Sequence, residues 1–179
     1  MIDQDVLIRS IAEATSEVFM TMLDMSIDCT GPANDSRPAD SGVVALVGIT
    51  GDWGGAGVFC CSPAFAAIIS ARMLGCSPDP AHSAIDEEVL DVVAELTNMM
   101  VGNIKNGLEP FTGPLAISVP TVIHGKNFQF RNGTGLRGAT LGFEAEQDRF
   151  EVRISLAPSD QQSMVRSRIP ILGLAHMDG

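Results

Sequence analysis

One segment, from Ser83 to Leu108, constrains the fold more than any other, because it has helical periodicity and is apolar around most of its circumference. Successive residues of an α-helix are about 100° apart, and on this scale the polar residues gather within about 100° of the helix surface. Other helices or a sheet must therefore cover most of such a helix. The polar stripe that remains contains Asp91, Glu95, Asn98, Gly102, Lys105 and Asn106.

Local signals predict where this helix begins and ends. Ser83, followed three residues later by Asp86, resembles a capping box. Gly107 and Pro110 disfavour helix and predict its end. Two polar residues outside the stripe are expected to hydrogen-bond to backbone groups, because a buried polar group without a partner is costly: Thr97 and Asn103.

The other apolar patterns alternate between helical and extended spacing. Helices are predicted over Asp5–Met25 and over Pro63–Leu74, the second with Ser62 as N-cap and Gly75 at its end. A polar, proline-containing loop is predicted over Gly31–Gly42. The predicted strands are Val43–Thr50, Ala56–Cys61, Leu115–Ile123, Phe128–Arg131, Ala139–Ala145 and Phe150–Leu156.

The order of these elements is helix, hairpin, two helices and then a run of strands. This order favours an α+β fold with a largely antiparallel sheet packed with about three helices, because parallel sheets need alternating strands and helices. The 179 residues fit one domain over residues 1–157, followed by a C-terminal tail over residues 158–179. The tail begins polar and ends apolar, and its sequence leaves open whether it docks on the domain or is disordered.

The charge of the chain limits its partners. Eleven Lys and Arg against 22 Asp and Glu give a formal net charge of −11, so nucleic acids and anionic membrane surfaces are poor partners. A charge-free run over residues 53–71 is divided by Ser62 and Pro63, so no membrane insertion is expected. The acidic N-terminus does not resemble a signal peptide, and a cytoplasmic location is expected.

The four cysteines show no zinc-type spacing. Cys60 and Cys61 are adjacent and would point to opposite faces of a strand. Reduced thiols are the favoured interpretation, with a disulfide or a metal site as the alternatives. No metal site and no cofactor of its own are predicted for the chain.

The polar stripe itself has two interpretations. A solvated helix face is the commoner one. Against it, the stripe is narrow and contains Gly102, which costs a helix roughly 1 kcal/mol relative to alanine and leaves bare backbone for another molecule to approach. Asp91, Glu95 and Asn98 lie at positions i, i+4 and i+7, and so they line up along one edge of the helix.

The run from Asp91 through Glu95 and Asn98 to Gly102-Asn-Ile-Lys105 resembles the signature helix of the CheC/CheX/FliY family of chemotaxis phosphatases, and among them CheX most. Other parts of the chain are similar to this family as well, so the resemblance covers residues 5–157. These parts are the segment Val18–Leu23, the glycine-rich hairpin around Gly48 and Gly57, and the segment Ser118–Gly125 with its Pro120.

The resemblance implies hydrolysis of the aspartyl phosphate of a phosphorylated CheY-like receiver domain. It implies that Asn98 orients the attacking water and that Glu95 binds a lysine of the partner. Asp91, Gly102 and Lys105 are expected to support the site or contact the partner, although Lys105 also fits an ordinary surface lysine. Any Mg²⁺ is expected on the receiver domain.

The resemblance also implies a homodimer joined through the sheet. The strands predicted over Leu115–Ile123 and Ala139–Phe143 are long or apolar and carry few charges, so an uncovered edge would recruit a second strand. One site per chain is expected, because the first helix has Glu13-Ala-Thr-Ser16 where some family members carry a second Glu-x-x-Asn.

Two other functions remain open from the sequence. The fold resemblance extends to the flagellar switch protein FliM, which implies a non-catalytic binding or scaffold module for a phosphorylated regulator. A dimerisation module with a vestigial site is the third interpretation.

Overall fold

The computed structural model describes residues 2–33, 42–77, 85–126 and 135–160. Within these residues it has three helices and a seven-stranded sheet in which every pairing is antiparallel, which confirms the predicted α+β fold. The helices are α1 (Gln4–Leu23), α2 (Pro63–Met73) and α3 (Glu87–Thr112). The strands are β1 (Asp28–Pro32), β2 (Gly42–Gly51), β3 (Trp53–Cys61), β4 (Leu115–Ile117), β5 (Thr121–Gly125), β6 (Arg137–Ala145) and β7 (Asp148–Pro158).

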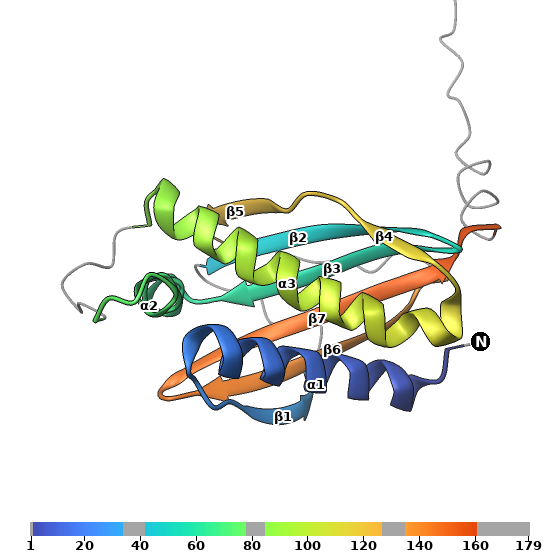
Figure 1. Cartoon of the computed structure of the whole chain (residues 1–179), viewed down its shortest axis with the longest axis horizontal. Helices are drawn as coiled ribbons and strands as arrows, with labels where there is room; N and C mark the ends of the chain where they lie inside the picture. The colour runs from blue at the N-terminus through green and yellow to red at the C-terminus, as the bar shows by residue number, and fades with distance from the viewer. Residues whose placement is uncertain (1, 34–41, 78–84, 127–134, 161–179) are drawn as a thin grey trace, which may run out of the picture.

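The sheet has the strand order β1-β6-β7-β3-β2-β4, and β5 also pairs with β2. Strands β4 and β5 therefore form one edge together, since β4 pairs with the end of β2 and β5 with its beginning. Helices α1 and α3 lie side by side across one face of the sheet, and α2 lies at one end of that face (Figure 1). In the part of the chain that is described, no helix combines the length and the apolar character needed to cross a membrane.

A cluster of phenylalanines forms the centre of the core between the helices and the sheet. The ring of Phe150 in β7 has its centroid 4.7 Å from that of Phe19 in α1, 5.4 Å from Phe65 in α2 and 5.1 Å from Phe143 in β6. All four side chains are buried. The aromatic rings thus fix two helices on the sheet, and α3 packs beside them with its own apolar side.

The predicted ends of α2 are confirmed, because local side chains determine them. Ser62 Oγ accepts a hydrogen bond of 3.0 Å from the backbone N–H of Phe65, and Pro63 follows as the first helical residue. Gly75, just after the helix, has φ +70°, a left-handed conformation that glycine adopts without strain.

Three of the predictions for extended segments are wrong. Residues 28–32 form the edge strand β1, although the last two of them were predicted to belong to the loop Gly31–Gly42. The strand predicted over Leu115–Ile123 is divided into β4 and β5 at Ser118–Pro120, where proline has no N–H to donate. The segment Ala139–Phe143, predicted as an exposed edge, lies in β6 between β1 and β7. The strand predicted over Phe128–Arg131 lies outside the described residues.

Candidate functional site

Helix α3 begins where a carboxylate caps it. The side chain of Asp86 accepts a hydrogen bond of 3.0 Å from the N–H of Val89, so Asp86 is the N-cap and the helix begins at Glu87. Ser83, predicted as the first capping residue, lies outside the described residues.

The predicted end of α3 is wrong, because the helix continues through Gly107 and Pro110 to Thr112. Tertiary packing overrides the low propensity of these two residues, since Leu108 and Thr112 are buried. Gly113, at φ +83°, then closes the helix with an N–H bond of 3.0 Å to the carbonyl of Glu109.

The polar stripe lies on the side of α3 that the sheet and the other helices leave open. Asp91 and Glu95 are exposed and Asn98 is half-buried. Among the described residues, none makes a hydrogen bond or ion pair with these three side chains. Along the helix axis Glu95 and Asn98 are about 4.5 Å apart, so one partner surface can contact both.

Polar residues outside the stripe behave differently. Thr97 is buried and its hydroxyl donates a hydrogen bond of 2.7 Å to the carbonyl of Val93, as predicted. Asn103 is half-buried, and the hydrogen bond predicted for it is not found among the described residues. It borders a groove between α1 and α3 instead.

A glycine of the sheet sets how closely α3 packs. A Cβ atom on Gly57 of β3 would lie 2.5 Å from Cγ2 of Val101 in α3. Side-chain atoms do not tolerate such a distance, so the helix rests directly on the backbone of β3. This close contact holds the buried side of α3 in place and fixes the direction in which the stripe points.

Gly102 lies toward the sheet edge rather than at the centre of the open stripe. It is half-buried, and a Cβ atom at this position would be 3.8 Å from Cδ1 of Ile117 in β4, an ordinary van der Waals distance. Asn98 precedes it by one turn and shares its side of the helix.

Replacing Gly102 by alanine is therefore expected to raise the free energy of unfolding by up to about 1 kcal/mol, the difference in helix propensity. Urea unfolding measures it. Gly107→Ala is a matched control, because its Cβ would lie only 3.3 Å from Ser10 Oγ and a smaller gain is expected. A destabilised Gly102→Ala variant would show that no room exists beside Ile117.

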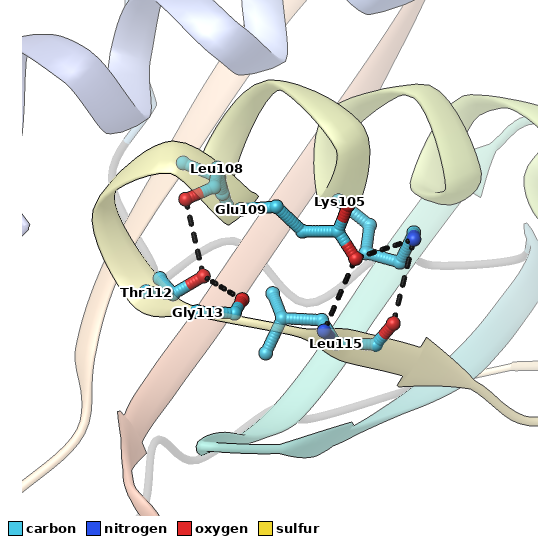
Figure 2. Close-up of polar contacts among 6 residues, drawn as sticks. All are labelled: Lys105, Leu108, Glu109, Thr112, Gly113 and Leu115. Atoms are coloured by element: carbon cyan, nitrogen blue, oxygen red, sulfur yellow. Dashed lines mark hydrogen bonds and ion pairs between the residues drawn. The ribbon is translucent and has the colours of Figure 1, made fainter.

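Lys105 bonds to other residues of the chain. The sequence instead led us to expect an ordinary surface lysine or a contact with the partner. Its Nζ donates to Oε1 of Glu109 at 2.8 Å and to the carbonyl of Leu115 at 3.4 Å (Figure 2). The same Oε1 accepts the N–H of Leu115 at 3.1 Å. Lys105 and Glu109 thus tie the last turns of α3 to β4, the strand that pairs with the end of β2.

Sequence reasoning missed Glu109. The i, i+4 spacing of Lys105 and Glu109 was a signal for an ion pair, but Leu115 lies beyond the helix and no periodicity relates it to them. The hydrogen bond from Lys105, followed by that from Leu115, lowers the pKa of the Glu109 carboxyl. A lowered pKa means that the charged carboxylate stabilises the folded chain above the ordinary pKa and stops doing so as the pH falls through the lowered value.

The variant Glu109→Gln is expected to be less stable than wild type at pH 7, because it loses the charge that Lys105 binds. The difference should shrink to zero as the pH falls through the lowered pKa, where the wild-type carboxyl is also neutral. Urea unfolding between pH 7 and pH 3 measures both stabilities. In a Lys105→Gln background the same change should cost less, and a cost independent of pH would contradict the pairing.

The cysteines are free, and two of them lie where burial disfavours the thiolate. Burial and, next, the charge of Glu151 raise the pKa of Cys60 to about 12, and burial raises the pKa of Cys61 well above its ordinary value. Cys61 belongs to the core and Cys60 lies on the other face of β3, as predicted. The described residues contain no group of three metal-ligating side chains.

The polar stripe presents the carboxylate of Glu95 and the carboxamide of Asn98 side by side on α3. Neither group makes a hydrogen bond or ion pair with another described residue. A carboxamide both donates and accepts hydrogen bonds, which suits the orientation of a water molecule. A carboxylate suits the binding of a cation such as a lysine of a partner.

The chain is similar to known proteins over most of its length. Residues 43–144 match the family model described as chemotaxis phosphatase CheX. No curated protein matches the chain significantly.

Solved structures share the fold. A CheC-like superfamily protein from Shewanella sp. PV-4 is 26% identical with a TM-score of 0.73, covering 87% of this chain and 99% of its own. The chemotaxis protein CheX from Vibrio vulnificus is 22% identical with a TM-score of 0.73, covering 84% and 99%. The CheX of a complex with CheY, BeF₃ and Mg²⁺ from Borrelia burgdorferi is 21% identical with a TM-score of 0.68, covering 87% and 99%.

Proposed function

This chain belongs to the chemotaxis phosphatase CheX family, and from that premise we propose that it dephosphorylates the aspartyl phosphate of a CheY-like receiver domain. In this reaction water attacks phosphorus and the bond between phosphorus and the aspartyl oxygen breaks. The products are inorganic phosphate and a free aspartate. The relative from Borrelia burgdorferi is a CheX in complex with CheY, which supports a partner of this class.

The observation that carries the proposal is the set of unpartnered polar side chains on the open stripe of α3. The side chains of Asp91, Glu95 and Asn98 make no hydrogen bond or ion pair with another described residue, whereas those of Thr97 and Lys105 nearby both bond within the fold. A helix buried on most of its surface has few positions for polar groups, and these three lie along one edge.

We assign the orientation of water to Asn98. An acyl phosphate is labile, so a catalyst needs only to place a water molecule in line with the phosphorus, as the water-positioning glutamine of GTPases does. The amide of Asn98 accepts a hydrogen bond from the water and donates one to an oxygen of the phosphoryl group.

We assign docking to Glu95. Its exposed carboxylate binds a lysine of the receiver domain and fixes the position of Asn98 against the phosphoryl group. Asp91, one turn earlier, supports this contact. The chain carries a net charge of −11, so binding an acidic phosphoryl site depends on such local pairs rather than on long-range attraction.

The chain itself supplies no cofactor in this proposal. We propose that Mg²⁺ is held by the receiver domain, in keeping with the Mg²⁺ in the CheX–CheY complex from Borrelia burgdorferi. There it would neutralise charge on the phosphoryl oxygens.

We also propose a homodimer joined along the β4–β5 edge. Strand β5 pairs with β2 alone among the described strands, and Ile123 on it is 50% exposed. Unpaired strand edges recruit a second strand, and a two-fold dimer closes the edge without further growth.

Light scattering at micromolar concentration is expected to give the mass of two chains. Ile123→Lys, which places a charge on this edge, is expected to shift the mass toward one chain. A wild-type mass of one chain with full activity would contradict the dimer.

The experiment for the function itself follows the decay of phosphorylated receiver domains from the same genome, with and without the chain. A phosphatase shortens the lifetime of at least one of them. A binding module of the FliM type leaves the lifetime unchanged or lengthens it while still forming a complex. A chain that does neither contradicts both functions.

A further inference from the structure

A groove between α1 and α3 has no role in the proposed function. It has a volume of about 340 Å³ and is open to solvent. Val6, Glu13 and Glu17 line it from α1, and Asn103, Gly107 and Phe111 line it from α3. Phe111 is 51% exposed, an unusual state for so large an apolar side chain. In helical projection Asn103 and Gly107 lie on the side of α3 away from Asn98, so the groove and the proposed site are separate.

The wall contributed by α1 continues as a stripe with a definite order. Val6, Arg9, Glu13, Glu17 and Met20 fall within about 80° of the helix surface. The stripe therefore runs from an apolar end beside Phe111, past two carboxylates, to Met20, which is 47% exposed. Among the described residues, no side chain forms a salt bridge with Glu13 or Glu17.

The C-terminal tail begins at the apolar end of this groove. The N–H of Ser159, just after β7, donates to the carbonyl of Asp52 at 3.0 Å, and the N–H of Asp52 donates to the carbonyl of Pro114 at 3.3 Å. Pro114 is the second residue after the end of α3 and the third after Phe111. The end of β7, the end of α3 and the beginning of α1 lie together at this end of the molecule (Figure 1).

We propose that the tail of the same chain, residues 161–179, binds in this groove. The order of its residues matches the order of the α1 stripe. Apolar Met164 and Val165 come first, then Arg166 and Arg168, then the apolar block Ile169–Leu174. In the docked tail the first pair covers Val6 and Phe111, the arginines bind Glu13 and Glu17, and the apolar block covers Met20.

The spacing of the charges agrees with this register. Arg166 and Arg168, two residues apart in an extended segment, point the same way and are about 6.6 Å apart. Glu13 and Glu17 are one turn apart on α1, about 6 Å along its axis. Pro170 and Gly173 disfavour helix in the apolar block, which fits an extended segment.

The length of the tail and the position of Arg9, the remaining charged residue of the groove, are also compatible with the proposed binding. Six residues from Asp160 to Arg166 span up to about 20 Å, whereas Glu13 is only about 10 Å along α1 from Val6 at the mouth of the groove. Arg9 is the one cation among the residues lining the groove, and the tail residues that precede Arg166, residues 161–165, are uncharged and do not repel it. The docked tail leaves Glu95 and Asn98 open.

Hydrogen–deuterium exchange of the full chain, read by mass spectrometry, tests this proposal. The amides of residues 169–174 are expected to exchange at least tenfold more slowly in the chain than in a free peptide of residues 161–179. Glu13→Lys with Glu17→Lys is expected to remove this protection, and so is Arg166→Glu with Arg168→Glu. A variant with all four changes reverses the charges of both proposed arginine–glutamate pairs, and it is expected to restore the protection from exchange.

Glu87→Lys with Glu88→Lys is the matched control, since it makes the same charge change at the beginning of α3, about 22 Å along the helix axis from Asn103, and should leave the protection intact. Exchange at the rate of the free peptide in wild type would overturn the proposal. Protection that all variants retain would overturn it as well. Protection that disappears on tenfold dilution would place the tail of a second copy in the groove and overturn the intramolecular form.

Discussion

The variant Asn98→Ala is expected to dephosphorylate the receiver domain at least 100-fold more slowly than wild type at saturating receiver concentration. The water that attacks phosphorus loses the group that orients it, and removing one such preorganised contact typically costs a factor on the order of 10²–10³. The fold should not suffer, because Asn98 is only half-buried, bonds to no described residue and is replaced by a better helix former.

Asn106→Ala is the matched control for this variant. It removes the same carboxamide from an exposed position two turns further along the same helix. Its turnover is expected to remain within about twofold of wild type, in keeping with the small effects of most surface changes. Equal losses in both variants, or activity of Asn98→Ala close to wild type, would remove Asn98 from the reaction.

The variant Glu95→Ala is expected to act mainly on binding. A charge-assisted hydrogen bond is worth on the order of 1.5–3 kcal/mol, so the affinity for the receiver domain should fall by about 10- to 150-fold. A titration of the receiver at fixed chain concentration separates binding from turnover. Turnover at saturation should stay near that of wild type.

Asp28→Ala is the control for charge alone. Asp28 is exposed in β1, at the sheet edge opposite β4 and β5, so its loss changes the net charge of the chain by the same amount without touching α3. An unchanged affinity of Glu95→Ala, with turnover reduced instead, would show that Glu95 takes part in the chemistry rather than in docking.

The sequence predicts elements well where local groups determine them. The ends of α2 follow from Ser62, which caps the first turn, and from Gly75, which adopts a left-handed conformation after the last. The open stripe of α3 follows from helical periodicity alone, since Asp91 and Glu95 are exposed where the projection places them.

Sequence patterns fail to predict elements whose formation or length depends on contacts with residues far away in the chain. Gly107 and Pro110 disfavour helix, yet α3 continues past both because Leu108 and Thr112 pack in the core. Strand β1 contains Gly31 and Pro32 and has little strand propensity of its own. It forms because β6 offers a partner and because an edge strand tolerates proline at its end.

The candidate site likewise combines features that local sequence predicts with features that depend on distant contacts. Periodicity places Glu95 and Asn98 together because both belong to one helix. It gives no account of Lys105, whose partners include the carbonyl of Leu115 in β4. The position of β6 inside the sheet was equally beyond local pattern, because the pairing of β6 with β1 and β7 depends on the whole topology.

The number of phosphoryl groups that one chain removes tests the central claim most directly. With one chain present for every 50 phosphorylated receiver domains, release of inorganic phosphate is measured over time. A phosphatase whose site is the polar stripe of α3 is predicted to empty the whole receiver pool well before the acyl phosphate decays by itself. Phosphate release that never exceeds the spontaneous rate, although a complex forms, would contradict the claim and leave a binding module.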